Sequence, residues 1–137
     1  MQGLLIMFLA FDLAAVRSEP NLERRSERAL ENANAALDSA REAYKSSDFA
    51  ATQSALEETR ESVDLSYQSL QETGKEPRRS QAFKRAELRT RELLRRLDGL
   101  RESFSPADRQ LLDHVRDRVA EVHDELLKGI MGNRKRK

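Results

Sequence analysis

Residues 83–104 read FKRAELRTRELLRRLDGLRESF and carry an apolar or small side chain at steps of three and four throughout. These positions are Phe83, Ala86, Thr90, Leu93, Leu97, Leu100 and Phe104. Residues at this heptad-like spacing share one face of an α-helix, and such a face must be buried against another element. Residues 112–126 repeat the pattern with Leu112, Val115, Val119, Val122 and Leu126. The spacing therefore predicts long amphipathic helices, as in bundles and coiled coils.

Two earlier segments show the same periodicity. Asn21 is a good N-cap, so a first helix is expected from there to about Ser46. Its seam consists of Leu22, Ala29, Ala33, Ala36, Ala40 and Ala43. All of these except Leu22 are small, and the larger residues Leu30, Leu37 and Tyr44 flank the seam. A second helix should bury Phe49, Thr52, Leu56, Thr59, Val63, Ser66 and Leu70, with Tyr67 beside them. Gly74 is placed to end it in the left-handed conformation.

The boundaries of the last two helices are marked by turn residues. A third helix is expected from about Arg79 to Ser103, continuing through Gly99 because the apolar register is kept. The segment 105–108, Ser-Pro-Ala-Asp, combines a hydroxyl N-cap with proline at the first helical position and an acid near the positive helix end. A fourth helix should start there and run to about Met131, where Gly-Asn follows.

Four helices of roughly 25 residues, each about 38 Å long, are joined by short connections. Short connections make successive helices antiparallel, so residues 19–132 are predicted to form an all-α, antiparallel up-down-up-down four-helix bundle. The alternative is two stacked helical hairpins, because the join from Ala43 to Ala50 is similar to the turn of a tetratricopeptide unit. That alternative is weaker, since the helices are too long and no repeat of about 34 residues recurs.

Composition limits the class of protein. The 137 residues suffice for one domain, and 36% are charged while 5% are aromatic, which favours helices with polar outer faces over a β-sandwich. The absence of cysteine excludes disulfides and thiolate chemistry. Residues 19–74 carry 6 basic and 12 acidic side chains, and residues 75–137 carry 18 and 11, giving net charges of −6 and +7. We expect these halves to attract each other within one fold.

The first 18 residues are predicted to be a signal peptide. An apolar run over residues 4–10 resumes up to Val16, and Val16 and Ser18 fit cleavage before Glu19. No basic residue follows the initiator methionine and Asp12 interrupts the run, so an uncleaved membrane anchor and a first helix of a cytosolic protein remain as alternatives. The run is short for a span of about 20 residues. Export to the periplasm or the medium is the expectation.

Several segments resemble short, exported, all-helical proteins of soil bacteria whose activity is uncharacterised. The likeness extends over about residues 20–132, and it is carried by residues 60–67, 77–80, 83–87, 90–97, 122–127 and 129–131. It implies an all-helical fold and export. It implies no activity, ligand or site, and no cofactor is expected.

The third helix offers the best candidate site, an anion-binding face formed by Arg78, Arg85, Arg89 and Arg96 at steps of seven and four. Such a stripe could follow phosphates, and the basic tail 133–137 could contact nucleic acid or anionic lipid. Its aromatic neighbours lie on the buried seam, so no platform for stacking bases interleaves the arginines. Pairing with acidic residues of the same fold is therefore the preferred interpretation, and a protein partner or self-association is expected rather than nucleic acid.

Metal binding and catalysis are not expected. His114, Asp117, Glu121 and Asp124 share one side of the fourth helix, but the Glu-x-x-His spacing of metal sites in bundles is absent. The five glycines form no phosphate loop, and no nucleophile, histidine and carboxylate are spaced as a catalytic set. A non-enzymatic binding or structural role in the cell envelope is the leading hypothesis, and anion binding by the third helix and the tail is the alternative.

Overall fold

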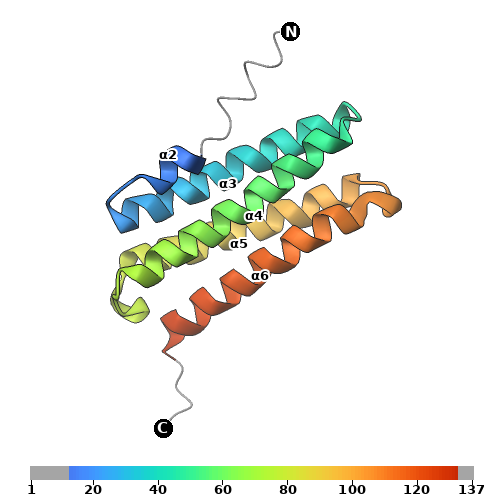
Figure 1. Cartoon of the computed structure of the whole chain (residues 1–137). Coiled ribbons are helices and arrows are strands. Elements are labelled where there is room, and N and C mark those ends of the chain that lie inside the picture. The colour runs from blue at the N-terminus through green and yellow to red at the C-terminus, as the bar shows by residue number, and fades with distance from the viewer. Residues whose placement is uncertain (1–12, 133–137) are drawn as a thin grey trace.

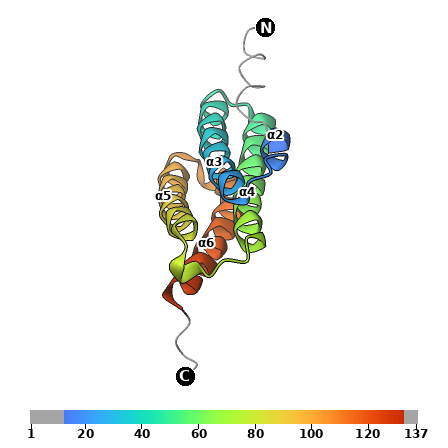
Figure 2. The ribbon, with the colours of Figure 1, turned by 90° about the vertical axis from the view of Figure 1, so that its left-hand side faces the viewer.

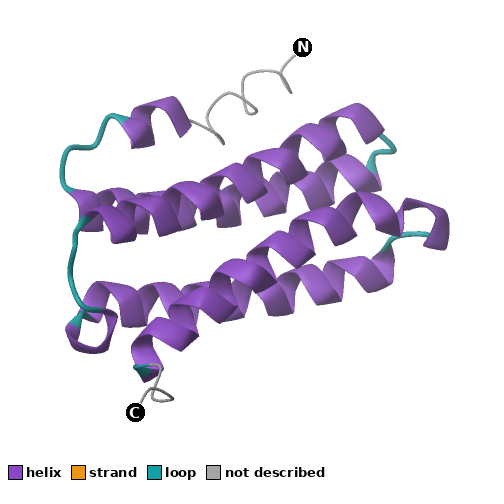
Figure 3. Ribbon diagram, turned by 60° about the horizontal axis from the view of Figure 1, so that its bottom comes forward, coloured by secondary structure: helices purple, strands orange, loops and turns teal. Residues whose placement is uncertain are grey.

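A computed structural model describes residues 13–132, and in this part of the chain every regular element is helical (Figures 1 and 3). The elements are α2 (Leu13–Arg17), α3 (Leu22–Lys45), α4 (Phe49–Glu72), the 3-10 turn η1 (Pro77–Arg79), α5 (Gln81–Ser103), the 3-10 turn η2 (Pro106–Asp108) and α6 (Arg109–Met131). The predicted all-α class is confirmed. Most of the predicted signal segment (1–12) and the basic tail (133–137) lie outside the described residues. Within residues 13–132, no helix is long and apolar enough to cross a membrane.

Side-chain caps fix the starts of the three helices α3, α4 and α5. The Asn21 side chain accepts a hydrogen bond from the Arg24 N–H at 2.9 Å, and Asp48 accepts one from Ala51 at 3.1 Å. Ser80 does the same for the Phe83 N–H at 3.2 Å. At the other ends, Gly74 follows α4 with φ +70° and Gly132 ends α6 with φ +81°, a region that glycine enters without steric cost. The expected glycine stops are therefore confirmed.

Two predicted helix starts are wrong by a few residues. The segment 77–79 forms the separate turn η1, and α5 begins at Gln81 because Ser80, rather than a residue before it, supplies the cap. Ser105 does not cap a helix with its hydroxyl. Its Oγ donates to Asp108 Oδ2 at 2.9 Å, while its N–H donates to the Tyr44 hydroxyl at 2.8 Å. Proline at position 106 therefore opens the 3-10 turn η2, and α6 begins only at Arg109.

The four long helices pack as two hairpins, α3 with α4 and α5 with α6 (Figures 1 and 2). The hairpins meet through α3 against α5 and through α4 against α6, whereas the consecutive helices α4 and α5 touch only sparsely. Ion pairs give the directions. Arg85 pairs with Glu27, and Arg96 pairs with Asp38, with 58 positions between partners in both cases. A constant separation means that α3 and α5 run parallel.

The predicted apolar seams of α5 and α6 are buried along their whole length. The six seam positions within α5, Phe104 directly after it and all five seam positions of α6 are buried, and Leu97 is 0% exposed. In α4 the expected seam is buried from Thr52 to Leu70, but Phe49 is 50% exposed, so its predicted burial is wrong. Phe49 is the first residue of α4 at the tip of the hairpin, where its ring makes an edge-to-face contact with the Tyr44 ring, with centroids 5.9 Å apart.

Small residues form the interface between α3 and α4. Ala29, Ala33, Ala36 and Ala40 are each 0% exposed, and they face a row of buried hydroxyl-bearing residues on α4. Hydrogen bonds cross this interface from Ser26 Oγ to Ser66 Oγ at 2.8 Å and from Asn32 Nδ2 to Ser62 Oγ at 2.9 Å. The short side chains let the two backbones approach closely, as the alanine seam predicted. The predicted seam ends, Leu22 and Ala43, are only half-buried.

The short helix α2 contacts α3 and α4 and neither α5 nor α6. Its Leu13 and Val16 form a small apolar cluster with Ala29 and Leu65 that is separate from the main core. Burying two such side chains contributes about 1.5–3 kcal/mol each.

Candidate functional site

Two arginines of the predicted anion-binding face, Arg85 and Arg96, lie along the seam between α5 and α3. Arg85 Nε donates to Glu27 Oε2 at 3.1 Å. Arg96 donates to Asn34 Oδ1 at 2.7 Å and also pairs with Asp38. The side chain of Arg96 is 28% exposed, whereas that of Arg85 is half-exposed. Two of the four predicted residues are therefore neutralised by the neighbouring hairpin.

The other two predicted residues differ from this pattern. Arg89 is exposed on the same face of α5, and the 58-residue separation places it opposite Glu31 of α3. Arg78 is not on α5 at all, so its assignment to this face is wrong. It lies in η1 at the end of the molecule, where its Cδ is 2.8 Å from the point a Cβ on Gly132 would occupy. The face that the structure brings together is thus Arg85, Arg89 and Arg96.

A shallow groove continues this face toward the end of α5. It has a volume of about 300 Å³ and is lined by Leu37, Arg41, Arg96, Gly99, Leu100 and Ser103. Leu37 is 1% exposed and Leu100 is 8% exposed, so little apolar surface is open at its floor. Gly99 has no heavy atom within 4 Å of the position a Cβ would take, which shows that the groove is wide above it. The groove therefore has an arginine on each wall and a small open floor.

A buried ionic cluster that sequence reasoning missed joins α5 to α6. Glu87 is 6% exposed and accepts two hydrogen bonds from Arg91, at 3.0 Å from Nε and 2.8 Å from Nη2. His123 Nε2 of α6 donates to the same carboxylate at 2.7 Å. Burial alone would raise the pKa of Glu87, but the hydrogen bonds and charges of Arg91 and His123 outweigh it and hold this pKa below its ordinary value. The cluster ties the two helices together through an ionised carboxylate.

The predicted histidine-bearing side of α6 faces solvent. His114, Asp117, Glu121 and Asp124 are all exposed, and His123 faces Glu87 instead. Among the described residues no three His, Asp, Glu or Cys side chains are grouped as metal ligands would be.

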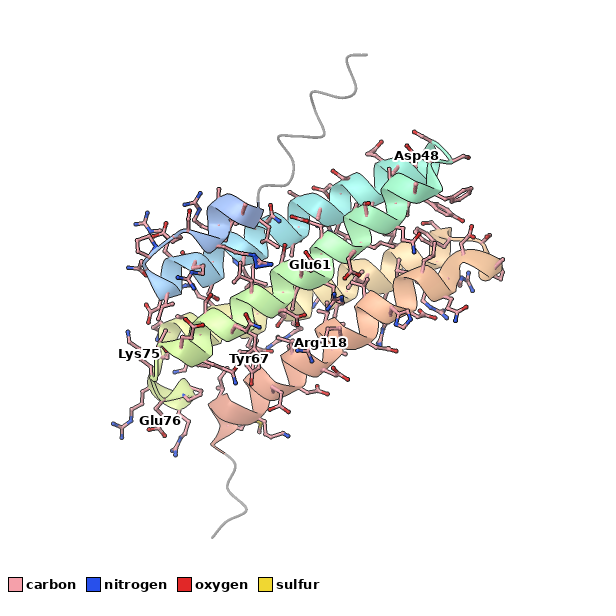
Figure 4. All side chains as sticks on the ribbon, viewed as in Figure 1. Asp48, Glu61, Tyr67, Lys75, Glu76 and Arg118 are labelled. Carbon is pink, nitrogen blue, oxygen red and sulfur yellow. The ribbon has the colours of Figure 1, made fainter. Side chains whose placement is uncertain are left out.

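Further ion pairs cover the surfaces between the hairpins and along the second one. Arg118 of α6, labelled in Figure 4, donates to Asp64 of α4 at 2.7 Å. Arg101 pairs with Asp113 at 2.6 Å, and this hydrogen bond from Arg101 lowers the pKa of Asp113. Asp98 and Arg116 continue the network at 2.7 Å around an open hollow of about 440 Å³. Each of these charged side chains therefore has an ion-pair partner of opposite charge.

Comparison with protein-family models, with curated proteins and with solved structures gives no match.

Proposed function

We propose that this protein is a non-enzymatic, exported helical protein that binds a protein partner or has a structural role in the cell envelope. One observation carries the proposal: the arginines of α5 are paired with acidic residues of α3, Arg85 with Glu27 and Arg96 with Asp38. A cationic face that is neutralised within the fold presents a weaker potential to a polyanion. Nucleic acid is therefore not the expected partner.

For the architecture we propose two antiparallel hairpins stacked on each other, so that the four helices alternate up and down; the alternative is a simple four-helix bundle in which each helix packs against the next. The partners of α5 on α6 support the antiparallel direction, because they descend from His123 to Arg116 and Asp113 as α5 ascends from Glu87 to Asp98 and Arg101. The sparse contact between α4 and α5 supports hairpins as the building units. Like helices of the two hairpins, α3 with α5 and α4 with α6, lie side by side, which supports stacking, because a simple bundle would place α4 against α5 and α6 against α3.

The proposed export rests on the sequence, with its apolar run over residues 4–10 and the small residues before Glu19. We expect the mature protein to begin at or near Glu19. Fractionation of the native host followed by N-terminal sequencing checks this. Protein that starts at Glu19 in the envelope or the medium supports export, and an intact Met1 in the cytosolic fraction contradicts it.

The binding role is tested by affinity capture of the mature protein from envelope extract, with partners identified by mass spectrometry. The informative control is the triple variant Arg85→Gln, Arg89→Gln, Arg96→Gln, because it removes the charges of the α5 face and leaves the core unchanged. We expect it to retain the same specific partner as the wild type. Loss of capture by this folded variant would favour the alternative, an anion-binding protein that uses α5 and the tail 133–137. The exposure of Arg89 is the observation that favours that alternative.

A further inference from the structure

The short helix α2 covers an apolar spot on the outer side of the first hairpin. In Figure 2 it lies beside α4, on the side away from α5. Leu13 and Val16 are 7% and 6% exposed, and they pack on Ala29 of α3 and Leu65 of α4. Leu65 is not part of the main core, so its large side chain on this face is covered by α2.

The turn that follows α2 is fastened to α3 independently of that contact. The Glu19 carbonyl accepts from Arg25 Nε at 2.9 Å, and its carboxylate accepts from Arg28 Nη1 at 3.1 Å and from the Asn21 N–H at 3.2 Å. These bonds lie on the α3 side of the turn, after Ser18. The Glu19 N–H also donates to the Val16 carbonyl at 3.0 Å, so displacement of α2 breaks this one bond, whereas the bonds of Glu19 to Arg25, Arg28 and Asn21 can remain. The predicted cleavage point falls between α2 and this anchor.

We propose that the face formed by Ala29 and Leu65 is a docking site for an amphipathic helix of a partner protein, and that α2 occupies it in cis until it is displaced or removed. The occupant is a short helix with large apolar side chains at positions i and i+3. α2 itself shows this chemistry, because Leu13 and Val16 have that spacing and Ala14 and Ala15 point outward. The inference rests on the proposed binding role and names its surface.

The first test uses the full chain and a fluorescein-labelled peptide of residues 10–20, with binding measured by fluorescence polarisation. In the double variant Leu13→Glu, Val16→Glu the cis helix can no longer seat, so the peptide should bind in trans. The matched control is Ala14→Glu, Ala15→Glu, which adds the same charges on the exposed side of α2. A tethered helix competes at an effective concentration of about millimolar. We therefore expect at least tenfold tighter binding to the first variant than to the control or the wild type.

The face itself is tested by adding Leu65→Glu to the first variant, which should abolish peptide binding. A peptide that carries both glutamates should also fail to bind. Equal affinity of the two double variants for the peptide, no binding by the first variant, or binding that survives Leu65→Glu would each overturn the proposal. Circular dichroism confirms that each variant keeps its helix content.

Hydrogen exchange of the wild type gives a second test that needs no substitution. Amides of residues 14–17 should exchange well before those in the middle of α3 and α4, because α2 opens as a separate unit. Exchange of α2 only together with α3 and α4 would mean that it is part of the global fold, and the proposal would be wrong. Neither test depends on where the protein is found, so failure here leaves the proposed envelope role to be judged by fractionation.

Discussion

Glu87 is the most deeply buried charged residue among residues 13–132, and its contact with His123 could not be predicted from the sequence. It stands next to Ala86 of the apolar stripe, and His123 stands next to Val122 of the facing stripe. The apolar repeat of a helix predicts which residues flank its buried stripe. It does not predict which of the two flanks packs against another helix. The contact between Glu87 and His123 depends on the register of α5 against α6, and this register is a property of the folded molecule.

The lowered pKa of Glu87 makes a prediction for acid stability. Because its pKa in the folded protein lies below the ordinary value of 4.5, the ionised group stabilises the fold at neutral pH. This stabilisation is lost as the pH falls from about 4.5 through the folded pKa. Glu87→Gln should cost about 1–3 kcal/mol at pH 7, since it weakens the bonds to Arg91 and His123. Urea unfolding from pH 7 to pH 3 should show the difference from wild type shrinking below pH 4.5.

The matched control for this series is Glu92→Gln, which removes an exposed carboxylate paired with Arg95 at 3.3 Å on the same helix. Such exposed pairs contribute about 0–1 kcal/mol. If the cost of Glu87→Gln equals that of Glu92→Gln, or stays constant from pH 7 to pH 3, the buried cluster does not stabilise the fold as described.

Leu97 supplies the corresponding prediction for packing. It is 0% exposed in the middle of the α5 seam, so Leu97→Ala should reduce the free energy of unfolding by about 2–5 kcal/mol. Leu88→Ala on the same helix is the control, because Leu88 is 55% exposed and should change stability by less than about 0.5 kcal/mol. A cost below about 1 kcal/mol for Leu97→Ala in denaturant unfolding would show that the seam is not a core.

At the scale of the helices, two glycines show that room for a side chain and a suitable backbone conformation are separate requirements. Gly99 and Gly74 both have no heavy atom within 4 Å of a Cβ position, but Gly74 has φ +70° and Gly99 is inside α5. Gly99→Ala should therefore stabilise the protein by about 0.5–1 kcal/mol. Gly74→Ala should destabilise it by about 1–2 kcal/mol, because alanine resists the left-handed region. Thermal unfolding of the two variants measures both stability changes. Destabilisation by Gly99→Ala would mean that α5 is strained or covered at this position.

The helices themselves were largely predictable, because period, caps and glycine stops are local properties of the sequence. Thr90, Leu93 and Leu97 were placed correctly since the middle of a long helix has neighbours on its buried side along several turns. Phe49 was not, because a residue at the tip of a hairpin has no helix beyond it to cover its ring. Arg78 was misplaced for a related reason: whether a 3-10 turn or the helix follows Pro77 depends on which residue caps α5.

At the scale of the whole molecule, the acidic half and the basic half of the chain face each other. Lys75 pairs with Glu23 at 2.7 Å, and Arg118 pairs with Asp64 at 2.7 Å. Together with the two pairs between α5 and α3, these contacts join residues 19–74 to residues 75–137 at four points. Half-exposed pairs of this kind contribute about 0–1 kcal/mol each. We conclude that they orient the second hairpin on the first more than they stabilise it.

We propose that the α5 arginines pair within the fold rather than bind an external anion. Titration of duplex DNA into the wild type and into the triple variant Arg85→Gln, Arg89→Gln, Arg96→Gln, each at about 50 mM and 200 mM salt, tests it most directly. We predict weak binding by the wild type at the lower salt and almost none at the higher salt, with a small difference between the two proteins. Sub-micromolar binding by the wild type that survives the higher salt and vanishes in the folded triple variant would show that these arginines form an anion-binding face.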